Sequence, residues 1–145
     1  NIYIGEMAGK VLPEAFTCFT LNLDNLSELT KRFGYTVGDG VLKDFAGLVQ
    51  LMGDTEGMRG YNGVGRFVVF FEECSSKKAA AMIRILDNQV EEYNSLNPEY
   101  PIRYTATWAT TEETDTYEIR ELLRLSQKKW KQMEKEKKDK TEEET

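Results

Sequence analysis

The chain has 145 residues, of which 40% are hydrophobic and 30% are charged. This balance is typical of one globular domain with a buried core, and it argues against a disordered or membrane-spanning chain. The formal net charge of −6 disfavours nucleic acid as a partner, because that charge repels a phosphate backbone. The sequence has no histidine, which excludes Ser-His and Cys-His nucleophiles and the commonest zinc ligand.

Both ends of the chain differ in composition from its middle. We expect residues 1–15 to be an N-terminal arm and residues 139–145 to be a charged tail. The first residue is Asn rather than Met, so we expect a piece of a longer protein. The two cysteines lack a metal-binding spacing and fit a reducing cytosol. We therefore expect a cytoplasmic domain, and tethering to a membrane protein remains an open alternative.

The first regular element is expected at residues 16–23, where side chains alternate as in a strand. Its apolar side carries Phe19, Leu21 and Leu23. Its mixed side carries Cys18, Thr20 and Asn22. A helix should follow, with Asp24 or Asn25 as its cap and Gly34 as its end.

The later elements follow from turn residues and from apolar spacing. A second helix should begin near residues 38–39, with Asp39 as its cap. A hairpin is expected with strands at 58–61 and 66–72 around a glycine turn that includes Gly63 and Gly65. Ser75 or Ser76 should cap a third helix. A strand at 102–110 and a last helix from about 116 to 134 complete the order β-α-α-β-β-α-β-α.

This order predicts an α+β fold, a sandwich of the ferredoxin-like or nucleotide-cyclase-like kind. The helices are expected to cover one face of an antiparallel-rich sheet. Trp108 and Trp130 lie on stripes that should face the core, so we interpret them as packing residues rather than as a docking face.

Residues 21–49 resemble the opening half of a GGDEF domain, the diguanylate cyclase family. Positions that match its usual motif in register are Asp24, Gly34, Gly38, Asp39 and Leu42. The spacing to GVGRF at 63–67 and to the apolar strand after it also agrees. The resemblance covers about residues 16–138, which we take as the domain.

The family's chemistry, as the resemblance implies it, joins two GTP molecules into cyclic di-GMP with the help of magnesium. Carboxylates of the first strand and of the hairpin turn hold the metal in the family. The matching positions here are Asn22, Gly65 and Arg66. Because these residues supply no carboxylate, the resemblance predicts that the usual metal site is lost.

The resemblance also locates the nucleotide-binding positions. The family's two guanine contacts fall on Thr30 and Asp39, and its phosphate-binding lysine falls near Glu134. The predicted vestigial nucleotide site consists of Asn22, Asp24, Thr30, Asp39, Gly63, Gly65 and Arg66.

Simpler roles compete for three of these residues. Asp39 is equally suited to cap a helix, and Asp24 to cap a helix or form a turn. Arg66 is suited to grip an anion beside the glycine turn or to be a solvated hairpin residue.

We therefore expect a catalytically inactive GGDEF-like domain that acts as a regulatory or protein-interaction module of a larger bacterial signalling protein, and on this count we do not expect an enzyme. Its partners would be other domains of that protein or a signalling partner, with GTP left open as a ligand. No cofactor is expected. The alternatives are a nucleotide-sensing domain without turnover, an atypical active cyclase that uses Mg²⁺, and an unrelated ferredoxin-like domain.

Overall fold

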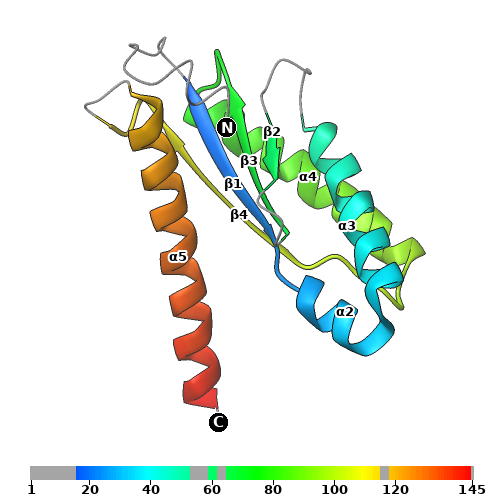
Figure 1. The fold of residues 1–145 in the computed structure, drawn as a ribbon. Coiled ribbons are helices and arrows are strands. Elements are labelled where there is room, and N and C mark those ends of the chain that lie inside the picture. Colours follow the sequence, from blue (N-terminus) through cyan, green and yellow to red (C-terminus); the bar gives the residue numbers. More distant parts are fainter. Residues whose placement is uncertain (1–15, 53–58, 62–64, 115–117, 145) are drawn as a thin grey trace.

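The computed structural model describes residues 16–52, 59–61, 65–114 and 118–144, and Figure 1 shows their arrangement. The predicted N-terminal arm and Gly63 lie outside these ranges. The elements are β1 (Thr17–Leu23), α2 (Leu26–Phe33), α3 (Tyr35–Gln50), β2 (Arg59–Tyr61), β3 (Arg66–Phe71), α4 (Ser76–Leu96), β4 (Tyr104–Thr110) and α5 (Ile119–Glu144). This order confirms the predicted β-α-α-β-β-α-β-α succession.

The four strands form one antiparallel sheet in the order β2-β3-β1-β4. The first strand of the chain therefore lies in the interior of the sheet. It pairs with β3 from Thr17↔Phe71 to Asn22↔Arg66, and with β4 from Thr17↔Thr110 to Leu23↔Tyr104. The predicted α+β class with an antiparallel-rich sheet is confirmed.

One face of the sheet packs against α3 and α4 in the larger of two apolar clusters. The predicted apolar side of β1 points into this cluster, where Phe19 and Leu21 are fully buried. From α3, Phe45 packs edge-to-face on Phe67 with ring centroids 5.7 Å apart. The helix α4 contributes Leu86, which is also fully buried. This face supplies most of the apolar burial that stabilises the domain.

The opposite face of the sheet is covered by α5, as Figure 1 shows. A second apolar cluster joins Cys18 of β1 and Phe70 of β3 to Ile119 and Leu122 of α5, all at most 1% exposed. The prediction that helices cover one face only is therefore wrong. The mixed side of β1 is a buried side as well, because neighbouring strands supply the apolar bulk that β1 itself lacks there.

Helix boundaries agree with the predictions at some ends and differ at others. Gly34 ends α2 with φ +91°, as expected for a glycine cap. The Oγ of Ser75 accepts a hydrogen bond from the N–H of Lys78 (3.1 Å) and so caps α4. However, α3 begins at Tyr35, so Asp39 lies inside the helix and the prediction of Asp39 as its cap is wrong.

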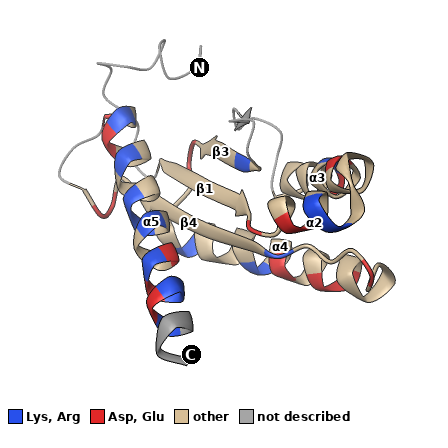
Figure 2. Ribbon diagram, turned by 60° about the horizontal axis from the view of Figure 1, so that its bottom comes forward, with Lys and Arg blue, Asp and Glu red and all other residues tan. Residues whose placement is uncertain are grey.

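The last helix is longer than the sequence pattern indicated. Apolar residues disappear after Met133, so the last helix was expected to end near residue 134, yet α5 continues to Glu144. Lysines and acidic residues alternate along its outer part in Figure 2, a pattern that supports helix through neighbouring opposite charges. None of the helices in the described ranges is long and apolar enough to cross a membrane.

Replacement of Leu122 by Ala tests whether α5 closes a second core. Leu122 is fully buried beneath α5, so we expect Leu122→Ala to lower the free energy of unfolding by about 2–5 kcal/mol. Lys131→Ala, at an exposed position of the same helix, should change it by less than about 0.5 kcal/mol. Urea unfolding followed by circular dichroism measures both, and equal small effects would contradict the second core.

Candidate functional site

The carboxylate of Asp24 is the centre of a polar cluster at the end of β1. Its Oδ1 accepts a hydrogen bond from Asn22 Nδ2 (2.6 Å), and its Oδ2 accepts one from Thr105 Oγ1 (2.6 Å). Lys137 of α5 places its Nζ 3.6 Å from the same Oδ2 and donates to Thr105 Oγ1 (2.6 Å). Asp24 thus has a donor on each oxygen and a lysine as its counter-ion.

Asp24 and Asn25 form the turn between β1 and α2, and Asn25 holds the N-cap position of α2. Neither side chain makes a capping hydrogen bond, so the prediction of a side-chain cap here is wrong. Asn25 instead donates to the carbonyl of Pro101 (2.7 Å) and accepts from the N–H of Arg103 (3.1 Å). Both side chains therefore tie the end of β1 to β4 and to the loop before it.

The residues of this cluster do not fit a divalent metal ion. Mg²⁺ takes oxygen ligands in near-octahedral geometry, usually one or two carboxylates together with water and substrate phosphate. Around Asp24 the nearest partners are an amide N–H, a hydroxyl and an ammonium group, all donors. No group of three or more potential metal-binding side chains occurs among the described residues. A cation at this position would have to displace Lys137 and would find one carboxylate.

Gly65 is fixed as glycine by its surroundings. It has φ +83°, a conformation that side chains rarely adopt. A Cβ built there would lie 3.1 Å from Leu26 Cδ2 and 3.4 Å from Leu23 Cβ. Its carbonyl accepts the N–H of Leu23 (2.8 Å). Gly65 therefore packs directly against the end of β1, and an acidic side chain there would need both a strained backbone and a small shift of Leu26.

Arg66 is half-buried and lies against a side chain of α5. Its guanidinium carbon lies 3.9 Å from the ring centroid of Trp130 on α5, close enough for a cation–π interaction. Trp130 is 6% exposed, which confirms its predicted packing role. Trp108 also packs, with its ring centroid 6.2 Å from that of Phe19. The positive charge of Arg66 is thus held beneath α5, beside the strand position of Asn22.

Thr30 and Asp39 lie apart from the Asp24 cluster, in a hollow between α2 and α3. They line a pocket of about 570 Å³ together with Leu26, Tyr35 and Lys43. The carboxylate of Asp39 is 61% exposed and pairs with Lys43 (3.4 Å). The two guanine-contact positions that the resemblance implied are therefore neighbours in space.

The structure divides the predicted site residues into two groups. Asn22, Asp24 and Arg66 lie at the side of the sheet that faces α5, whereas Thr30 and Asp39 line the pocket between α2 and α3. Gly65 lies between the groups, against Leu26.

Sequence reasoning missed Thr105 and Lys137, which complete the Asp24 cluster. The expected phosphate-binding position fell near Glu134, whereas the helix brings Lys137, nearly one turn later, to the site. The lysine-rich run at 128–140 was visible in the sequence, but its register on the sheet was not.

Neither cysteine adds reactive chemistry. Burial raises the pKa of the Cys18 thiol far above its usual value and also raises the pKa of Cys74. Both are free and buried. Since the thiolate is the nucleophilic form, both are expected to be inert packing residues.

A protein-family model described as "Diguanylate cyclase, GGDEF domain" matches residues 7–140. No curated protein matches the chain. Among solved structures, the active GGEEF domain of a diguanylate cyclase from Vibrio cholerae is similar, with a TM-score of 0.70 and 20% identity over 79% of this chain and 73% of that one.

Two multidomain proteins are also similar in fold. An EAL/GGDEF domain protein from M. capsulatus has a TM-score of 0.67 and 13% identity, over 86% of this chain and 80% of that one. Vibrio cholerae LapD, as an S helix-GGDEF-EAL structure bound to c-di-GMP, has a TM-score of 0.59 and 13% identity. The match covers 75% of this chain but 25% of the chain in that structure.

Substitution of Gly65 tests whether the turn excludes a side chain. We expect Gly65→Ala to lower the free energy of unfolding by about 1–3 kcal/mol, from the positive φ and the contact with Leu26. Gly47→Ala is the matched control, because Gly47 lies within α3 with no neighbour within 4 Å of a built Cβ. That change should raise stability by about 0.5–1 kcal/mol. A stabilising effect of Gly65→Ala would contradict this account.

Proposed function

Because the chain belongs to the diguanylate cyclase GGDEF domain family, we propose that it is a catalytically inactive member of that family. The observation that carries this proposal is the occupied carboxylate of Asp24. Its oxygens accept hydrogen bonds from Asn22 and Thr105, and Lys137 supplies the positive charge. Carboxylates that bind Mg²⁺ need the opposite arrangement, with their oxygens directed at the ion.

The hairpin turn supports the same proposal. The two positions where the family's acidic residues are expected hold Gly65, which has no side chain, and Arg66, which stacks on Trp130. A positive charge at this point opposes the approach of a divalent cation to the end of β1. The joining of two GTP molecules requires that the negative charge at the α-phosphate be neutralised. Loss of the metal removes this neutralisation.

We further propose that the domain is a regulatory or protein-interaction module of a larger signalling protein. Two proteins of similar fold are described as having both a GGDEF and an EAL domain, the M. capsulatus protein and LapD. A domain that retains the fold and has lost the metal-binding acids is suited to contact other domains and to transmit a signal between them.

A turnover assay tests the proposed inactivity. We expect no cyclic di-GMP after incubation of the chain with GTP and Mg²⁺ or Mn²⁺, measured by mass spectrometry beside an active GGDEF domain. Lys137→Ala should stay inactive too, because removal of the lysine restores no acid at Gly65 or Arg66. Lys138→Ala, at the next position on α5, is its matched control. Product from the unmodified chain would refute the proposal.

Nucleotide sensing without turnover is a second candidate, favoured by the pocket between α2 and α3. Thr30 and Asp39 line this pocket together, and Lys43 adds a positive charge at its edge. At a purine edge, an exposed aspartate is suited to accept hydrogen bonds, and a hydroxyl beside it is suited to donate one.

Calorimetry with GTP, GDP and ATP tests this second function. If the pocket binds guanine, Asp39→Ala should weaken GTP binding by about tenfold or more through the loss of a charged hydrogen bond. Glu28→Ala is the matched control, because it removes a similar i,i+4 ion pair, to Arg32, outside the pocket. Absence of heat at millimolar nucleotide would exclude sensing and leave the interaction role.

A further inference from the structure

The outer edge of β4 carries main-chain groups that no other strand covers within the described residues, because β4 ends the sheet order. Two hydrogen bonds fix which groups these are. The carbonyl of Arg103 accepts from Asp24 N (2.8 Å), and the N–H of Thr111 donates to Phe16 O (3.0 Å). In an antiparallel pair such groups alternate. The N–H and C=O of Ala106 and Trp108 therefore point away from β1.

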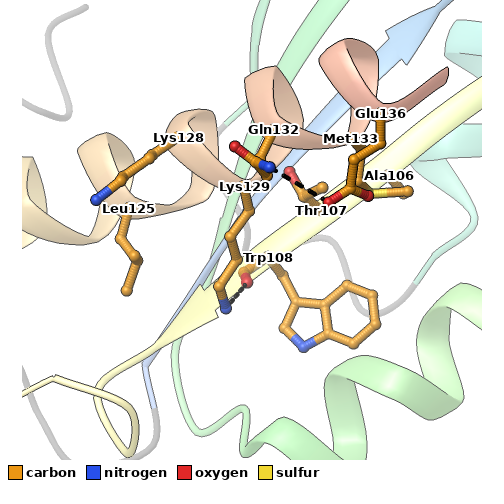
Figure 3. A pocket seen from close by; sticks show the side chains of 9 residues that line it. All are labelled: Ala106, Thr107, Trp108, Leu125, Lys128, Lys129, Gln132, Met133 and Glu136. Carbon is orange, nitrogen blue, oxygen red and sulfur yellow. Dashed lines mark hydrogen bonds between the residues drawn. The ribbon is translucent and has the colours of Figure 1, made fainter. Parts of the chain in front are cut away.

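Lys129 confirms this direction and partly closes the edge. Its Nζ donates to the carbonyl of Trp108 (2.8 Å) and also pairs with Glu113, as Figure 3 shows for the carbonyl. In the parts of the chain that are described, nothing bonds the outward N–H and C=O of Ala106 or the N–H of Trp108. A residue placed opposite Ala106 would exchange two main-chain hydrogen bonds with it.

Two adjoining hollows follow this edge. The larger, of about 620 Å³, lies between β4 and α5, and the smaller, of about 170 Å³, reaches towards α4. Both are lined by Ala106 and Met133, so they adjoin each other, and we call them together the β4 trough. Leu125 and Trp108 extend its apolar lining (Figure 3). Met133 is 38% exposed, so an apolar side chain from an added strand would bury it.

The three lysines that line the trough differ in their ionic partners. Lys129 pairs with Glu113, and Lys137 pairs with Asp24. The exposed amine of Lys128 makes no ion pair within the described ranges. An acidic side chain beside an apolar one therefore complements the trough.

We propose that the β4 trough binds an extended segment of a partner protein, with alternating apolar and acidic residues, that pairs with β4 as an added strand. Main-chain bonds at Ala106 and Trp108 supply the pairing, and the trough selects the side chains. This inference rests on the interaction role proposed above and names a surface for it. Edge lysines also protect sheets from aggregation, but Lys129 covers one carbonyl and leaves Ala106 open.

Synthetic peptides on the whole chain test the proposal. The probe is acetyl-TVTETVT-amide, which places valines and a glutamate on one face of a strand, and acetyl-TVTKTVT-amide is its matched control. Amide exchange followed by NMR should slow at Ala106 and Trp108 on addition of the glutamate peptide. By fluorescence anisotropy, the lysine peptide should bind about tenfold or more weakly.

Variants of the chain distinguish peptide binding at the trough from a general effect of charge. Lys128→Glu should weaken the glutamate peptide about tenfold, whereas Lys131→Glu, on the same helix outside the trough, should not. Ala106→Pro removes the outward N–H and leaves the bonds to β1 in place, so it should also weaken binding. Circular dichroism confirms that each variant is folded.

Three results would overturn the proposal. These are unchanged exchange at both amides, equal binding of the two peptides, and equal effects of the two lysine variants. Protection of both amides without peptide, by a second copy or by another segment of the same protein, would also overturn it. Each result is independent of the turnover assay, so a failed docking surface and a failed assignment of inactivity remain distinguishable.

Discussion

The structure depends on the burial of β1 on both of its faces. Every residue of this strand is buried, from Thr17 to Leu23, and it is hydrogen-bonded to β3 on one side and to β4 on the other. Strand pairing and side-chain packing both fix the register of such a strand. A slip of one residue would turn every side chain to the opposite face of the sheet. The positions of the turn after β1 and of the hairpin beside it follow from that register.

The polar cluster at Asp24 is a consequence of this constraint. The register brings Asn22 opposite Arg66 on β3 and opposite Thr105 on β4. The helix α5, packed across the same face, then delivers Trp130 to Arg66 and Lys137 to Asp24. Asp24, Lys137 and Arg66 therefore each have a partner from within the chain. The family's fold is retained, and these side chains interact with one another and with Trp130 at this end of the sheet.

Several features could be predicted from the sequence because they depend on local physical preferences. Alternation in β1, the glycine at Gly34 and the serine at Ser75 each fix a strand face or a helix end without help from distant residues. The start of α3 was wrong because Asp39 suits a cap chemically, yet a helix can begin at Tyr35 directly after the positive φ of Gly34. The expected end of the last helix near residue 134 was wrong because charge content alone does not decide helix length.

By itself, the sequence determined the order of elements, the family resemblance and the absence of acids at Asn22, Gly65 and Arg66, since each depends on residue identity and spacing. Only the tertiary structure decided that α5 covers the second face of the sheet, that Lys137 neutralises Asp24, and that Arg66 stacks on Trp130. It also decided that the outward groups of β4 face an apolar, lysine-lined trough. The physical reason is that these contacts join residues far apart in the chain, whose meeting depends on how a helix is rotated and shifted across a sheet.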